Sequence, residues 1–88
     1  MKTVVEVVEV EGEGLESLLG EQVIIFAACY IYAGKLIGVN KTCIKLGDAG
    51  IVYETGSFSD KGYKDIQKLT GKDHYISVSM IESFGKGK

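Results

Sequence analysis

The 88-residue sequence contains no proline, tryptophan or arginine, and it has only one histidine and two cysteines. Without arginine, the chain lacks the planar donor that binds phosphates and guanine bases through two parallel hydrogen bonds. A zinc site has little support, because His74 is alone and no CxxC pair is present. Cys29 and Cys43 fall in predicted strands, where we expect reduced, buried, small apolar side chains. No linker or low-complexity tract interrupts the chain, so we expect a single domain.

No group of residues has the spacing of a catalytic site. His74 has no nucleophile at a recognisable distance in the sequence, and cysteines within strands are poor candidates for Cys–His catalysis. The glycines at Gly12–Gly14 and Gly34–Gly38 lack the Gly-Lys-Ser/Thr ending of a phosphate-binding loop. We therefore expect a protein that is not an enzyme and uses neither a cofactor nor a metal.

Charge is distributed unevenly along the chain. Residues 1–22 carry one lysine and six glutamates, whereas residues 23–88 carry nine lysines and six acidic residues. A mild basic excess of this kind is more typical of a solvated surface than of a nucleic-acid footprint. The longest apolar run, residues 23–33, is too short to cross a membrane, and the valine-rich start lacks the pattern of a signal peptide. These features predict a cytoplasmic protein without a membrane partner.

The first third of the chain combines a valine-rich segment, a leucine-rich segment and a long apolar segment. Thr3–Val10 favours a strand or pairing arm, because β-branched residues fit extended structure. Leu15–Leu19 predicts a short helix that ends at Gly20. Gln22–Tyr32 predicts a strand with two apolar faces, whose outer face must be covered by another element or subunit.

The middle of the chain alternates glycines with apolar residues. Gly34 and Gly38 indicate a strongly bent strand, and Asn40 suits a tight turn because asparagine tolerates the left-handed conformation. The expected elements are the turn Val39–Thr42, a strand at 42–46, a second turn at Gly47–Gly50 and a strand at Ile51–Glu54.

The second half is less regular. Residues 56–73 are rich in serine, glycine and aspartate and favour loop, although Tyr63–Leu69 could form a short helix with Ile66 and Leu69 facing inward. Tyr75–Met80 alternates apolar residues with serines, which predicts a half-exposed strand, and Ile81–Phe84 predicts its continuation or another strand.

Together these elements predict an all-β fold, a small and strongly bent five-stranded SH3-like barrel with a short N-terminal helix and an additional candidate strand before it. Residues 1–13 would form the arm, residues 14–85 the barrel and residues 86–88 a frayed basic tail. A barrel of this size is often stabilised by self-association.

The aromatic residues offer a candidate binding surface. Single-stranded nucleic acid binds to aromatic rings beside positive charge, and the chain has five tyrosines and three phenylalanines. Tyr30 and Tyr32 flank Ile31 and point to one side, and Tyr53 is a candidate third member. Lys35, Lys41 and Lys45 surround the predicted bend and turn. The alternative is that the rings belong to the core or to an interface and that the lysines are ordinary surface residues, and composition favours this alternative.

The order of these features resembles that of the Sm-like family, which includes the Sm, LSm and Hfq proteins. Leu15–Leu19 is similar to the family's opening helix. Gly34, Leu36 and Asn40 fall on the first Sm motif, in which a glycine is followed by an aliphatic residue and then by an acid, which Asn40 replaces here. Tyr75–Phe84 has the apolar pattern of the second motif. The resemblance covers residues 14–56 and 75–85.

The resemblance implies a ring of subunits joined through edge strands, for which Tyr53–Glu54 and the 75–80 strand are the candidates. It also implies an RNA site on two loops. The corresponding residues are Asn40, Lys41, Thr42, Ser77 and Ser79. The chain departs from the family in lacking both the Arg-Gly and the Tyr-Lys-His of the second motif, and in having Thr42 where a base-stacking aromatic is usual.

The expected function is therefore that of a non-enzymatic, Sm-like, ring-forming protein that binds single-stranded RNA and itself. The first alternative is a homo-oligomeric scaffold or accessory protein, for example phage-encoded, that has lost RNA recognition. The second alternative is an SH3-like barrel that binds a peptide.

Overall fold

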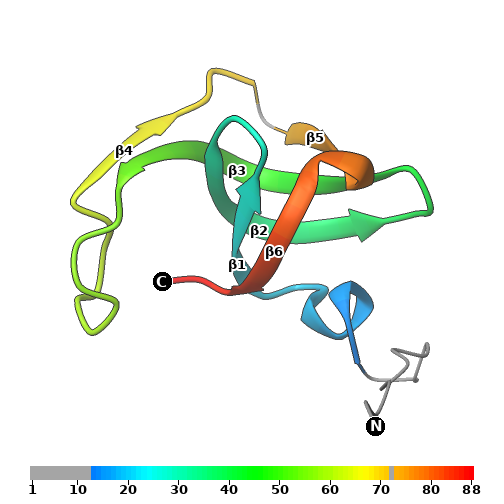
Figure 1. The fold of residues 1–88 in the computed structure, drawn as a ribbon, viewed down its shortest axis with the longest axis horizontal. Coiled ribbons are helices and arrows are strands. Elements are labelled where there is room, and N and C mark those ends of the chain that lie inside the picture. Colours follow the sequence, from blue (N-terminus) through cyan, green and yellow to red (C-terminus); the bar gives the residue numbers. More distant parts are fainter. Residues whose placement is uncertain (1–12, 72) are drawn as a thin grey trace, which may run out of the picture.

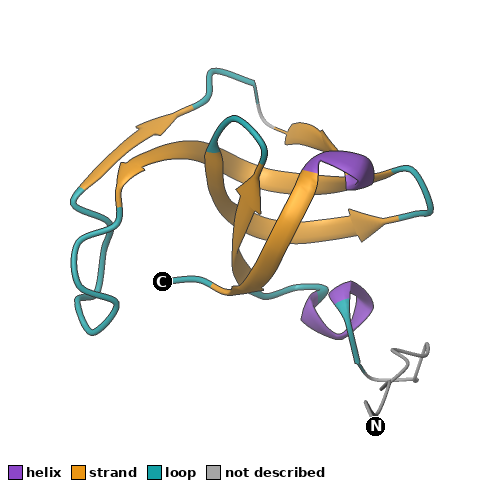
Figure 2. Ribbon diagram, in the orientation of Figure 1, coloured by secondary structure: helices purple, strands orange, loops and turns teal. Residues whose placement is uncertain are grey.

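The computed structural model describes residues 13–71 and 73–88, and within them the fold is all-β without an α-helix (Figures 1 and 2). The predicted all-β class is confirmed, and the described residues form six strands where the predicted barrel has five. The predicted strand at Thr3–Val10 lies outside the described residues. The elements are a 3₁₀-helix η1 (Leu15–Leu18), β1 (Gln22–Ala27), β2 (Ile31–Val39), β3 (Cys43–Glu54), β4 (Asp65–Lys68), β5 (Asp73–Ser77), a 3₁₀-helix η2 (Val78–Met80) and β6 (Ile81–Lys86).

The strands form one antiparallel sheet in the order β4-β3-β2-β1-β6, with β5 also paired to β3. Strand β3 is 12 residues long and pairs with β2 along one side and with both β5 and β4 along the other. Its first half pairs with β5, from Cys43 opposite Ser77 to Gly47 opposite Asp73, and its second half pairs with β4. Figure 1 shows β1 and β6 running across the direction of β2 and β3. This arrangement brings the end of β5 and the short η2 close to the β1–β2 connection.

The predicted single strand Gln22–Tyr32 is a hairpin in the structure. Strand β1 ends at Ala27, and the Ala27 amide donates to the carbonyl oxygen of Tyr30 at 3.0 Å to close a tight turn. Phe26 and Ile31 then face each other in the antiparallel register. The uninterrupted apolar run conceals this turn, because neither glycine nor proline marks it.

The bend predicted at Gly34 coincides with a β-bulge between β2 and β3. Two steps along β2, from Ala33 to Lys35, face three steps along β3, from Gly50 to Gly47, so β3 carries an extra residue there. A side chain at position 34 would lie 2.9 Å from the Gly47 carbonyl oxygen, which only glycine avoids. The turn predicted at Gly47–Gly50 is wrong, because β3 continues through it. Asp48, with φ of 50°, adopts the left-handed conformation that accommodates the extra residue of the bulge.

The core lies between β1, β2, β3 and β5. Its members are buried aliphatic residues: Val23, Ile25, Leu36, Ile44, Leu46, Ala49 and Ile76. Leu15 and Leu18 of η1 pack against this core from one end, as the predicted leucine stripe requires. The amide of Gly20, in the left-handed region with φ of 87°, donates to the Leu36 carbonyl oxygen at 2.7 Å and fixes η1 to β2.

The segment predicted as a helix at Tyr63–Leu69 contains strand β4 instead. Ile66 pairs with Val52 of β3, and Gly50 leaves the space for it, since a side chain at position 50 would lie 2.9 Å from the Ile66 side chain. The backbone polar groups of β3 provide hydrogen-bond partners for this segment, whereas a seven-residue helix would leave most of its own backbone groups unpaired. The helix prediction is therefore wrong.

The predicted strand Tyr75–Met80 ends earlier, at Ser77, because η2 turns the chain into β6. The predicted frayed tail is also wrong. Lys86 belongs to β6, and the Gly87 amide donates to the Gln22 carbonyl oxygen at 2.9 Å. The end of the described chain is thus held against β1.

Candidate functional site, an aromatic pocket

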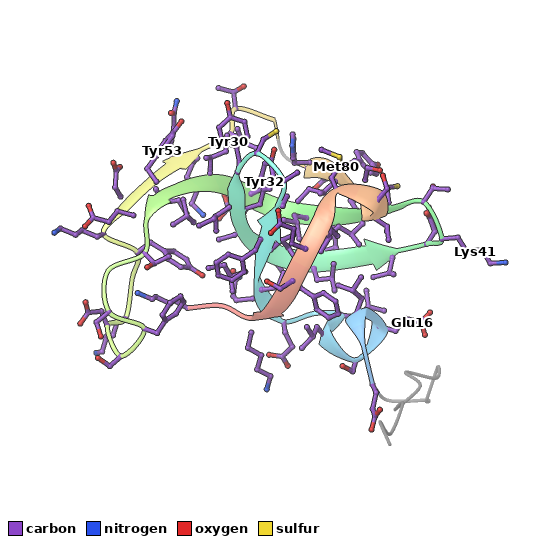
Figure 3. The ribbon with its side chains drawn as sticks, in the orientation of Figure 1. Glu16, Tyr30, Tyr32, Lys41, Tyr53 and Met80 are labelled. Atoms are coloured by element: carbon purple, nitrogen blue, oxygen red, sulfur yellow. The ribbon has the colours of Figure 1, made fainter. Side chains whose placement is uncertain are left out.

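An open pocket of about 280 Å3 lies where the β1–β2 connection meets β5 and η2. Six of the residues that line it come from four segments of the chain. Cys29 and Tyr30 come from the β1–β2 connection, Tyr32 from β2, Tyr75 and Ser77 from β5, and Met80 from η2. Figure 3 shows Tyr30, Tyr32 and Met80 close together on one side of the sheet. We call this set of six residues the aromatic pocket.

Two of the three tyrosines of the aromatic pocket present their rings to solvent. Tyr30 is 49% exposed and Tyr75 is 60% exposed, so neither ring belongs to the core, and the alternative that Tyr30 belongs to an interface stays a prediction. The half-buried Tyr32 anchors the group. Its ring meets that of Tyr30 edge to face, with centroids 6.2 Å apart, and stacks on His74 with centroids 5.4 Å apart. The exposed rings are therefore held by a packed neighbour.

Positive charge lies at the edge of the aromatic pocket. The Lys45 Nζ atom is 5.5 Å from the centroid of the Tyr75 ring and 3.5 Å from an oxygen of Asp73. The pKa of Lys45 is raised, chiefly by the Tyr75 side chain and then by the Asp73 carboxylate. Burial raises the pKa of Tyr32, with Tyr30 and Cys29 adding to the effect. At neutral pH, Lys45 is therefore charged and the Tyr32 hydroxyl is neutral.

The five predicted site residues come together beside the aromatic pocket. The Val78 amide donates to the Thr42 carbonyl oxygen at 2.9 Å, and Cys43 pairs with Ser77, so the β2–β3 turn lies against η2. All five predicted side chains are exposed, and Ser77 also lines the pocket. The hydroxyls of Ser77 and Ser79 are 2.9 Å apart. Lys41 lies at the tip of the turn and points away from the sheet (Figure 3).

Asn40 stabilises the turn with its side chain and not with the predicted left-handed backbone conformation. Its Oδ1 atom accepts hydrogen bonds from the Thr42 amide at 2.8 Å, the Thr42 hydroxyl at 3.0 Å and the Cys43 amide at 2.9 Å. Asp48 is the only residue other than glycine with positive φ in the described part of the chain, so Asn40 does not adopt the left-handed conformation. The side chain itself closes the turn.

Replacing Asn40 with alanine is expected to lower the free energy of unfolding by about 1 kcal/mol, because two backbone amides lose their acceptor. Chemical denaturation of the variant measures this loss. Asn40→Asp keeps an acceptor at the same position and should stay within about 0.5 kcal/mol of the parent protein. Equal losses in the two variants would contradict a structural role for Oδ1.

Several residues of the site were not predicted. The sequence pattern places Tyr75 and Met80 only in a predicted strand, and Lys45 reaches the aromatic pocket through its pairing with Tyr75 across β3 and β5. Cys29, predicted to be buried in a strand, is exposed in the β1–β2 connection, and Cys43 is half-buried. The Tyr53 hydroxyl contacts the Gln67 side chain at 3.2 Å, away from the pocket lining. The pairing of β3 with β5, which selects these partners, has no local signal in the sequence.

Within residues 13–71 and 73–88, the structure contains no group of three or more potential metal ligands. No helix in this described part of the chain is long and apolar enough to cross a membrane.

No protein-family model matches the chain, and no curated protein matches it.

Proposed function

We propose that the protein binds single-stranded RNA at the aromatic pocket. The observation that supports this proposal best is the pair of exposed rings, Tyr30 and Tyr75, at an open pocket with the Lys45 ammonium beside Tyr75. Unpaired bases stack on exposed aromatic rings, and lysines beside them neutralise the phosphates. The predicted site residues extend the same surface, since Ser77 belongs to both sets.

The path of the RNA would run from the aromatic pocket over Ser77 toward Lys41. Thr42 and Val78 join these two regions through their backbone hydrogen bond, so a bound strand would meet one continuous surface. The Ser77 and Ser79 hydroxyls can bind phosphate or sugar oxygens along it. Because the chain has no arginine, we expect stacking and charge to dominate over sequence recognition.

We further propose that the sheet forms an Sm-like, bent barrel. The chain reversal at η2 supports this proposal. There the Ala28 amide donates to the Met80 carbonyl oxygen at 2.9 Å, and this hydrogen bond joins the end of β1 to the β5–β6 connection. The pairing of β3 with both β4 and β5 is consistent with a strand shared between two parts of a barrel wall.

Self-association through strand edges is part of the same proposal. Strands β4, β5 and β6 each pair with a single partner in the described residues, which leaves one side of each available. The 75–80 region therefore retains a candidate edge in β5. The Tyr53–Glu54 end is a weaker candidate, because Glu54 already pairs with Asp65 of β4. Phe84 on β6, 41% exposed, is an apolar side chain that a neighbouring subunit would cover.

Fluorescence anisotropy with labelled U-rich, A-rich and mixed RNA oligomers tests the proposal, with the mass of the protein in solution measured alongside. We expect affinity to fall as salt increases, since each neutralised phosphate contributes about −0.7 to the slope of log affinity against log salt. Lys45→Gln should make the slope shallower by about 0.7, the contribution of one phosphate contact. Lys61→Gln, in the loop before β4, is the matched control and should leave the slope unchanged.

Two outcomes would contradict RNA binding at this site. If no RNA binds but the mass in solution shows that the protein self-associates, the scaffold alternative replaces the proposal. If RNA binds with the same salt slope after Lys45→Gln, the binding surface lies elsewhere on the protein.

A further inference from the structure

The loop between β3 and β4 folds around the side-chain ammonium of Lys88. The Lys88 Nζ atom donates to three backbone carbonyl oxygens, those of Ser57 at 2.6 Å, Thr55 at 2.7 Å and Gly62 at 3.0 Å. The same nitrogen lies 5.3 Å from the centroid of the Phe58 ring and 5.1 Å from that of the Tyr63 ring. We call these three carbonyls and two rings the ammonium cage.

The ammonium cage matches one chemical group. A primary ammonium has three N–H donors and no acceptor, and three carbonyl oxygens satisfy all of its donors. The electron-rich faces of the two rings attract the same positive charge. A quaternary ammonium would fit the rings but could not donate to the carbonyls, so the cage is matched to a primary amine.

The shape of the loop is supported by contacts that do not involve Lys88. The Asp60 amide donates to the Ser57 carbonyl oxygen at 3.0 Å, and the Lys64 amide donates to that of Thr55 at 3.4 Å. Gly56, with φ of 69°, adopts the left-handed conformation that directs the chain between these two carbonyls. The cage should therefore keep its form when its occupant leaves.

Access to the ammonium cage is open on one side. Phe58 is 61% exposed, and Lys88 itself is only half-buried. Lys88 is held near the cage by its backbone, since its amide donates to the Tyr63 hydroxyl at 3.1 Å. Its side chain thus acts as a tethered ligand that an external amine must displace.

We propose that the ammonium cage is a binding site for primary ammonium groups, closed in this structure by Lys88 and able to accept a lysine side chain or a polyamine when Lys88 withdraws. The site lies on the β3–β4 loop and does not depend on RNA binding at the aromatic pocket. Lys88 competes with an external amine for the same three carbonyls.

Titration of n-butylammonium chloride, followed through the ring resonances of Phe58 and Tyr63 by NMR, tests the proposal. Lys88→Ala should bind the probe about ten-fold more tightly than the parent protein, the factor expected when a tethered ligand occupies about nine-tenths of the sites. Adding Phe58→Ala to Lys88→Ala should weaken binding again. Lys86→Ala, in the same terminal segment, is the matched control and should behave like the parent.

Two further probes test the chemistry of the cage. Tetramethylammonium should bind Lys88→Ala more weakly than n-butylammonium, because it offers no N–H donors. Nα-acetyl-lysine methylamide and spermidine then distinguish a protein lysine from a polyamine as the source of the amine. Equal affinity of Lys88→Ala and the parent for n-butylammonium, or equal binding of tetramethylammonium, would overturn the proposal.

A measurement on the intact protein covers the case in which Lys88→Ala disturbs the loop. The ammonium protons of Lys88 should exchange with water more slowly than those of Lys61, because three carbonyls hold them. Exchange at the same rate for both lysines would also overturn the proposal.

Discussion

Replacing Tyr75 with alanine is expected to weaken the binding of single-stranded RNA by about ten-fold, because stacking of one base on an aromatic side chain contributes roughly 1–3 kcal/mol. Tyr75 is 60% exposed and lines the aromatic pocket beside Lys45, so its ring is free to receive a base. The same exposure predicts a small effect on stability. Fluorescence anisotropy at constant salt measures the loss of affinity, and chemical denaturation measures the stability.

Two variants separate base stacking from general effects of removing a tyrosine. Tyr75→Phe keeps the ring and should bind RNA within about two-fold of the parent, about 0.4 kcal/mol on the affinity scale. Tyr53→Ala removes a ring of similar exposure, 56%, that does not line the aromatic pocket, and it should bind RNA normally. Equal losses for Tyr75→Ala and Tyr53→Ala would contradict stacking at the pocket.

Replacing Leu36 with alanine is expected to lower the free energy of unfolding by about 2–5 kcal/mol, the usual range for a leucine removed from a packed core. The Leu36 side chain is 0% exposed, and Leu36 faces Leu46 in the β2–β3 register, where both belong to the core. An 88-residue domain has a small stability margin, so this loss is a large part of the total. Thermal or urea denaturation measures it.

Ile37 provides the control next to Leu36 in the sequence. Its side chain is 42% exposed because successive residues of a strand point to opposite faces. Ile37→Ala should therefore cost less than about 1 kcal/mol, as expected for a largely surface position. A loss as large as that of Leu36→Ala would mean that a further element or subunit covers the outer face of β2.

The local elements that the sequence predicted correctly have strong local signals. The leucine stripe and Gly20 indicated η1, which the structure contains as a 3₁₀-helix, and Gly34 marked the bulge between β2 and β3. Asn40 marked the β2–β3 turn, although its side chain closes the turn without the left-handed backbone. Each of these features depends on residues within a few positions of one another.

The aromatic pocket shows what local signals could not supply. The sequence pattern pairs Tyr30 with Tyr32, but Tyr75 joins them only because β5 pairs with the first half of β3. The same β3 strand continues through a predicted turn and then pairs with β4, where a helix was predicted. Long-range strand pairing overrides weak local preferences, because it satisfies backbone polar groups that a short helix leaves unpaired.

The sequence by itself determined the all-β class and the turn at Asn40, because β-branched patterns, glycines and turn residues act on their immediate neighbours. Tertiary structure alone decided which side chains meet. It placed Ser77 beside the β2–β3 turn, Lys45 beside Tyr75, and the Lys88 ammonium within a loop that begins 33 residues earlier. Contacts over such distances depend on the register of the whole sheet, which no local pattern encodes.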